Sequence, residues 1–96
     1  PTAIFAASDV MALEVIDVAK ARKIKVPEEL SVVGFDDNPI NRTSSVPLST
    51  VAQPLVEMGR VGVENLFLVT QGKARLPVKE ILPTKLIKRN STQSIK

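Results

Sequence analysis

The sequence contains no cysteine and no histidine. Without thiols and imidazoles it cannot form disulfides, present a thiolate nucleophile, build a Ser-His-Asp triad or assemble an ordinary zinc site. Lack of cysteine fits a cytoplasmic protein. The side chains predict neither a cofactor nor a metal.

Long apolar runs are also lacking. The longest, residues 61–69, is interrupted by Glu64 and Asn65 and is too short for a transmembrane helix. No secretory signal pattern opens the chain. Pro1 leads directly into strand-like sequence without an initiator methionine, so we expect a piece of a longer protein.

Aromatic residues are scarce: the only ones are Phe5, Phe35 and Phe67, all of which we expect in the core. Charge is uneven, because residues 1–48 carry 5 basic and 7 acidic side chains (net −2) and residues 49–96 carry 8 basic and 3 acidic (net +5). The basic half has no interleaved aromatics and its charges are scattered. This favours a solvated surface over a nucleic-acid site.

The composition is that of a folded domain. Hydrophobic residues make up 44% of the 96 residues and charged residues 24%. A chain of this length forms one small domain that buries about two-thirds of its unfolded surface. Modest stability is therefore expected.

The first half predicts a β-α-β unit. A short apolar run at residues 4–7 ends at Ser8 and Asp9, both good N-cap residues, before a helical pattern at residues 10–23. Residues 30–35 are apolar and β-rich, typical of a parallel strand buried on both faces. The predicted fold class is α/β, with a parallel sheet and a right-handed crossover.

The second half predicts a strand at residues 48–52 and a helix at residues 54–71 that stops at Gly72. This helix is apolar on more than one side, so it needs cover over a wide arc, and Gly59 and Gly62 would allow a neighbour to approach closely. Further extended segments are expected at residues 78–82 and 84–88, before a polar, frayed tail at residues 90–96.

Polar residues follow each predicted strand: Ser8 and Asp9, then Asp36 and Asp37, then Gln53. Ligands bind at the carboxyl ends of the strands in open α/β sheets. A carboxylate that accepts hydroxyl protons makes strong hydrogen bonds, which favours Asp36 as a contact for a sugar-like ligand.

Structural interpretations of the same residues remain open. From spacing alone, the two pairs of polar residues favour helix caps and turns facing water, and Gln53 is equally compatible with a loop amide. The aspartates Asp9, Asp36 and Asp37 also permit a magnesium or acid/base cluster. No phosphate-binding glycine loop, nucleophile elbow or lysine motif accompanies them, so we predict that the chain is not an enzyme.

Four blocks in fixed order carry a family resemblance: PTAIFAASDVMAL, VPEELSVVGFDD, PLSTVAQPLVEMGRVGVENL and ILPTKLIKR. They resemble the C-terminal part of the effector-binding region of LacI-type transcription regulators. The resemblance implies a fragment of a type I periplasmic-binding-protein-like fold of two α/β lobes. It assigns residues 1–89 to this region and leaves residues 90–96 as a tail. The family's DNA-binding head is absent from the chain.

The resemblance also implies roles for individual residues. Asp36, Ser8 and Gln53 match effector contacts, although the serine departs from the family's common asparagine. The expected effector is a small molecule, in particular a sugar, and operator DNA would be bound only through the missing head. A homodimer interface is implied at six positions: Val10, Leu13, Asp17, Arg42, Thr43 and Ser44.

Lys23 lies where many relatives have a helix-ending glycine. In the family the chain crosses between lobes near residues 53–55, so the helix at residues 54–71 lacks most of its partners, and we expect domain swapping or self-association. The rival interpretation is a fragment of a periplasmic sugar-binding transport receptor, which shares the fold.

Overall fold

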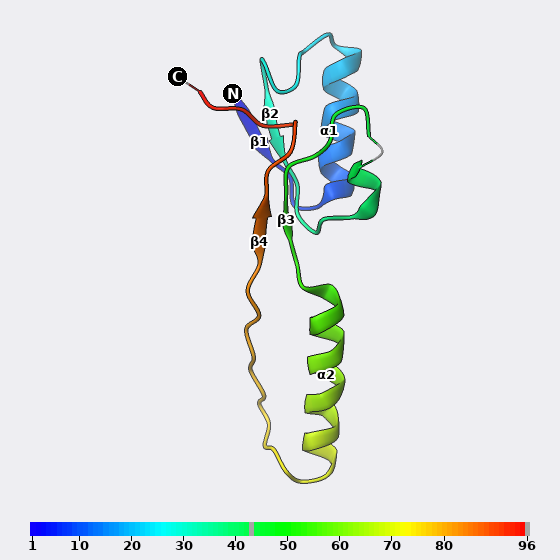
Figure 1. Cartoon of the computed structure of the whole chain (residues 1–96), viewed down its shortest axis with the longest axis vertical. Coiled ribbons are helices and arrows are strands. Elements are labelled where there is room, and N and C mark those ends of the chain that lie inside the picture. The colour runs from blue at the N-terminus through cyan, green and yellow to red at the C-terminus, as the bar shows by residue number, and fades with distance from the viewer. Residues whose placement is uncertain (43, 96) are drawn as a thin grey trace. The chain divides into compact units, whose positions relative to one another are not determined.

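The computed structural model describes residues 1–42 and 44–95 (Figure 1). The chain forms two compact units, Pro1–Gln53 with Lys85–Lys96, and Pro54–Thr84. The first unit therefore contains both ends of the described chain. The division falls where the family resemblance predicts that the chain crosses between lobes.

The first unit begins with the predicted β-α-β crossover. Strand β1 (Ala3–Phe5) pairs in parallel with β2 (Ser31–Val33), and helix α1 (Asp9–Ala21) connects them. Figure 1 shows α1 lying alongside the two strands. Within the helical pattern, Ala12, Ile16 and Ala19 are buried, whereas Met11 is 58% exposed.

Strand β3 (Thr50–Ala52) continues the sheet-like layer. Parallel bridges join Val33 to Ser49 and Asp36 to Ala52, so β3 runs beside the end of β2. Strand β4 (Lys85–Ile87) then pairs antiparallel with β3. Between β2 and β3 lies a short 3₁₀ helix, η1 (Pro39–Arg42).

The core is small and lies between α1 and the strands. Its buried apolar residues are Ala6, Ala12, Ile16, Ala19, Leu30, Val32 and Leu48. The prediction that the phenylalanines belong to it is wrong for two of them, since Phe5 is 68% exposed and Phe67 60%. Phe5 lies on β1, which has β2 as its only strand partner in the described chain, and Phe67 lies on the uncovered helix α2 (Leu55–Thr70).

The tail is also not frayed as predicted. Ser91 is fully buried, and its hydroxyl donates to Val32 O at 2.6 Å and accepts from Ser49 N at 2.8 Å. Val32 N in turn donates to Ser91 O at 2.8 Å. The tail is ordered because it satisfies backbone groups of β2 and β3.

The second unit holds α2 and an extended return segment. Within the described chain, no residue of α2 is buried, and a Cβ added at Gly59 or Gly62 would meet no atom within 4 Å. The broad apolar surface expected from the sequence is therefore present and uncovered. Of the two segments expected to be extended, residues 84–88 contain strand β4, whereas residues 78–82 pair with no strand of the described chain.

Helix ends differ from the prediction by one or two residues. Helix α1 ends at Ala21, and Lys23 follows with φ 60°. The family's usual glycine would relieve this conformation, which costs a residue with a Cβ on the order of 1 kcal/mol. No helix of residues 1–42 or 44–95 combines the length and apolar character needed to cross a membrane.

Candidate functional site

The ends of β2 and β3 bring Asp36 and Gln53 together. Asp36 N donates to Val51 O at 2.9 Å, which aligns the residue after β2 with the strand that leads to Gln53. Gln53 Nε2 then donates to Asp36 Oδ1 at 2.6 Å. Both residues are partly exposed, so this carboxylate keeps acceptor capacity for a further donor.

The neighbouring acid, Asp37, serves a different contact. Its Oδ1 accepts from Arg89 Nη2 at 2.8 Å, and the two side chains are only 20% and 16% exposed. Asp36 and Asp37 have φ 131° and 65°, so the backbone turns sharply between two carboxylates whose partners follow different strands, Gln53 after β3 and Arg89 after β4. The interpretation of this pair as a turn facing water therefore fails for Asp37, whereas Asp36 contacts Gln53 and is partly exposed.

Arg89 was not predicted as a functional residue. Its backbone N donates to Ser49 Oγ at 2.9 Å, and its Nη1 donates to Leu48 O at 3.0 Å. A guanidinium can make several such bonds at once because its donors lie in a rigid plane. The available signal was its place at the end of the fourth resembling block, ILPTKLIKR.

The side chain of Asp9 is fully buried and is the centre of a polar hub, a group of three hydrogen bonds from later segments of the chain. Its Oδ2 accepts from Asn38 N at 2.6 Å and Asn41 Nδ2 at 2.5 Å, and its Oδ1 accepts from Thr50 Oγ1 at 2.6 Å. Asp9 is thus neither the helix cap nor a ligand contact that the sequence left open. It ties the start of α1 to η1 and β3.

The second effector candidate from the first strand, Ser8, caps α1. Its Oγ accepts from Met11 N at 3.2 Å, which satisfies one of the free amides of the first turn. The hydroxyl proton remains available to donate, and the residue is partly exposed. Capping therefore leaves an effector contact at Ser8 chemically possible.

The three aspartates do not form a metal cluster. Asp9 is occupied by three protein donors, and Asp37 is paired with Arg89. Residues 1–42 and 44–95 contain no group of three or more acidic, cysteine or histidine side chains placed to hold a metal ion. The magnesium interpretation consequently has no structural support.

Part of the predicted dimer surface forms a shallow depression of about 270 Å³. Leu13, Asp17 and Ser44 line it, together with Ile40, which is 53% exposed. Val10 is 61% exposed one helical turn before Leu13. Of the remaining predicted residues, Thr43 and the side chain of Arg42 lie outside the described part of the chain.

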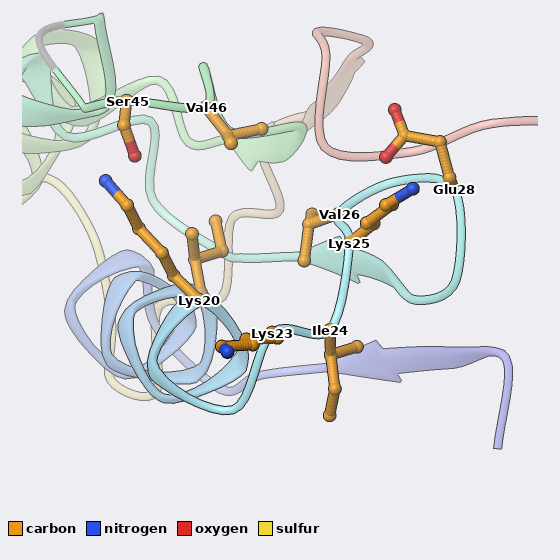
Figure 2. A pocket seen from close by; sticks show the side chains of 9 residues that line it. Lys20, Lys23, Ile24, Lys25, Val26, Glu28, Ser45 and Val46 are labelled. Atoms are coloured by element: carbon orange, nitrogen blue, oxygen red, sulfur yellow. The ribbon is translucent and has the colours of Figure 1, made fainter.

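A neighbouring, larger depression of about 430 Å³ lies beside the C-terminal end of α1 (Figure 2). Figure 2 shows Lys20 extending from the helix toward Ser45, with Lys23 and Lys25 on the segment that follows. Lysines near a helix C-terminus are favoured by the helix dipole. This depression shares no lining residue with the effector candidates, so it is not their binding site.

Comparison with known proteins places the chain in a family. The model of the periplasmic binding protein-like domain matches residues 1–92. The chain is 42% identical to the HTH-type transcriptional regulator DegA of Bacillus subtilis over 95 residues, covering 99% of this chain and 28% of DegA. It thus spans about a quarter of the length of this curated relative.

Solved structures agree in fold. The dimeric lac repressor bound to operator and the anti-inducer ONPF matches with a TM-score of 0.91 and 33% identity, over 98% of this chain and 32% of that one. The complex of the transcriptional regulator CelR with cellobiose matches with a TM-score of 0.89 and 38% identity, over 94% and 28%. The chain belongs to the periplasmic binding protein-like domain family and is similar to part of LacI-type transcription regulators.

Proposed function

We propose that the chain is the ligand-sensing and dimerising part of a cytoplasmic LacI-type transcription regulator, in which a small molecule, in particular a sugar, controls affinity for operator DNA. The chain itself contributes one side of the effector site and part of the dimer interface. DNA binding belongs to a head domain outside this chain. The relatives named above are regulators and not enzymes, which supports this role.

The Asp36–Gln53 pair carries the proposal. The Asp36 carboxylate can accept hydrogen bonds from sugar hydroxyls, while Gln53 Nε2, which donates one hydrogen bond to Asp36, has a second N–H that can donate to a hydroxyl oxygen. Together the two side chains match the donor and acceptor character of a hydroxyl group. Ser8 would add a third polar contact from the end of β1.

The central test measures sugar binding by the whole protein that carries this chain. Isothermal titration with cellobiose, glucose and sucrose compares the wild type with Asp36→Asn. The substitution removes the charge and exchanges an acceptor for a donor, so affinity for the bound sugar should fall by about 1.5–3 kcal/mol, which is roughly 10- to 150-fold. Gln53→Ala should weaken binding less, because its contact is neutral.

The matched control is Glu14→Gln, which removes the same kind of charge from an exposed position on α1. It should bind the sugar as the wild type does. If Asp36→Asn and Glu14→Gln bind equally well, Asp36 is not an effector contact. If the wild-type protein binds none of the three sugars, the sugar class itself is wrong.

Operator binding separates the regulator from its rival. A mobility-shift assay with the gene's own upstream DNA should show a complex whose affinity changes when the sugar is added. A transport receptor would bind the sugar and leave the DNA unshifted. That result would reject the regulator and retain the effector site.

A further inference from the structure

The two aspartates that follow β2 contact the two segments through which the chain leaves and re-enters the first unit. The chain leaves after Gln53 and returns at Lys85. Asp36 accepts a hydrogen bond from Gln53, at the point of departure, and Asp37 accepts one from Arg89, shortly after the return. Adjacent carboxylates therefore hold both connections.

The backbone at this point needs support. Positive φ at a residue with a Cβ is disfavoured, and two consecutive cases, Asp36 at 131° and Asp37 at 65°, persist only where surrounding contacts fix them. On one side Asp36 N is held by Val51 O at 2.9 Å. On the other side Asp37 is held by Arg89 at 2.8 Å.

Arg89 is itself anchored at three points on the first unit. Its backbone N bonds to Ser49 Oγ, and its guanidinium bonds to Leu48 O and to Asp37. The fixed angle between guanidinium donors sets the position of the Asp37 carboxylate relative to the backbone that enters β3. Because Asp36 is the preceding residue, its carboxylate is set relative to Gln53 by the same contact.

We infer that Asp37 and Arg89 are a positioning pair, which holds the Asp36 carboxylate beside Gln53 in the geometry that receives the effector. The inference rests on the proposed function for its effect on ligand binding. Its structural part stands separately, because it concerns only how Asp36 is held. A purely stabilising ion pair would instead strengthen the whole unit without favouring Asp36.

Amide hydrogen exchange of the 96-residue chain tests the structural part. Asp36 N and Gly34 N both donate across to β3 at 2.9 Å, to Val51 O and Ser49 O. In Asp37→Asn, exchange at Asp36 should become about tenfold faster, the factor expected for loss of one charged hydrogen bond. Exchange at Gly34 should change by less than about twofold.

Two further variants serve as an intermediate case and as a control for the exchange rates. Arg89→Lys keeps the charge but cannot make both guanidinium bonds, so exchange at Asp36 should be intermediate. Arg60→Lys alters an exposed ion pair on α2 and should leave both amides unchanged. Equal acceleration at Asp36 and Gly34 in Asp37→Asn, or no acceleration at either, would overturn the positioning role.

Sugar titration of the whole protein, with cellobiose, glucose and sucrose as probes, tests the functional part. Asp37→Asn should weaken binding about tenfold when Asp36 is present, and should weaken it no further in the Asp36→Asn background. The same loss in both backgrounds would reject positioning through Asp36. If the wild type binds none of these sugars, the proposed function fails, while the exchange rates still decide how Asp36 is held.

Discussion

The two units of this chain reach order by different means. The first unit contains every buried residue of the described chain, both the apolar core and the polar hub around Asp9. In the second, α2 exposes most of its large apolar side chains, including Val56, Leu66 and Phe67. One unit is stabilised by its own contacts, whereas the other presents a surface that still needs a partner.

The first unit compensates for a small core with buried hydrogen bonds. Three of its seven core residues are alanines, which bury little apolar area each. Asp9 and Ser91 instead connect segments that are far apart in the sequence. Substitutions at these contacts should therefore destabilise the first unit.

The largest expected effect is that of Asp9→Ala. The substitution leaves Asn38 N, Asn41 Nδ2 and Thr50 Oγ1 without their acceptor, two of them on buried side chains. Unfolding free energy measured with denaturant should fall by about 3–5 kcal/mol, a large share of the stability of a small domain.

The matched control for Asp9→Ala is Glu14→Ala, on the exposed side of the same helix. It should change stability by less than about 0.5 kcal/mol. Similar losses in the two variants would mean that removal of an acidic side chain from α1, and not loss of the buried hydrogen bonds, accounts for the effect of Asp9→Ala.

Much of the first unit could be predicted from local pattern. The helical pattern at residues 10–23 predicted α1, and the β-α-β order predicted the parallel pairing of β1 with β2. The same topology placed Asp36 and Gln53 at one edge, and the structure brings them into contact. These features could be predicted because each follows from the pattern of residues that are close together in the sequence.

Contacts between distant segments could not be predicted in this way. Asp37 and Arg89 are 52 positions apart, and Ser91 and Val32 are 59 apart. Their pairing depends on the register of strands only three residues long, which hydrophobic alternation does not fix. Asp9 looked like a helix cap for the same reason, since its partners Asn41 and Thr50 come from later in the chain.

The exposed apolar side chains of α2 are expected to cause self-association. The 96-residue chain should self-associate or swap domains at micromolar concentration, because exposed apolar faces of this extent seek cover. In sedimentation velocity, Leu66→Asp with Phe67→Asp should lower the average mass toward the monomer without changing the stability of the first unit.

The comparison variant Val10→Asp tests the proposed dimer face on α1. If it lowers the mass more than the paired α2 substitutions, association occurs through the dimer face. A wild-type chain that remains monomeric on concentration would contradict the prediction for both surfaces.

Glycine-to-alanine substitutions are expected to have opposite effects on stability in the two units. A Cβ at Gly34 would lie in steric conflict with Asp9 Oδ1 and 2.9 Å from Leu48 Cδ2, so Gly34→Ala should cost about 1–3 kcal/mol. A Cβ at Gly62 meets nothing within 4 Å, so Gly62→Ala should stabilise α2 by about 0.5–1 kcal/mol. Thermal unfolding followed by circular dichroism measures both, and a loss at Gly62 would show that a neighbour already covers the helix there.

The smallest expected effect concerns the exposed charges of α2. Arg60 bonds to Glu57 and Glu64, and its hydrogen bond to Glu57 lowers the pKa of that carboxyl below its usual value of 4.5. Because the folded pKa is the lower one, the contribution to helix stability is present above about pH 4.5 and is lost as pH falls through the folded value.

Far-UV circular dichroism should therefore show a slight loss of helix on acidification, which is reduced in Glu57→Gln and in high salt. Glu80→Gln, which lies outside the helix, should lose as much helix on acidification as the wild type does. If Glu57→Gln loses as much helix on acidification as the wild type does, the Arg60–Glu57 ion pair makes no measurable contribution to helix stability. Exposed ion pairs of this kind are weak, so they cannot replace the apolar cover that α2 lacks in its own unit.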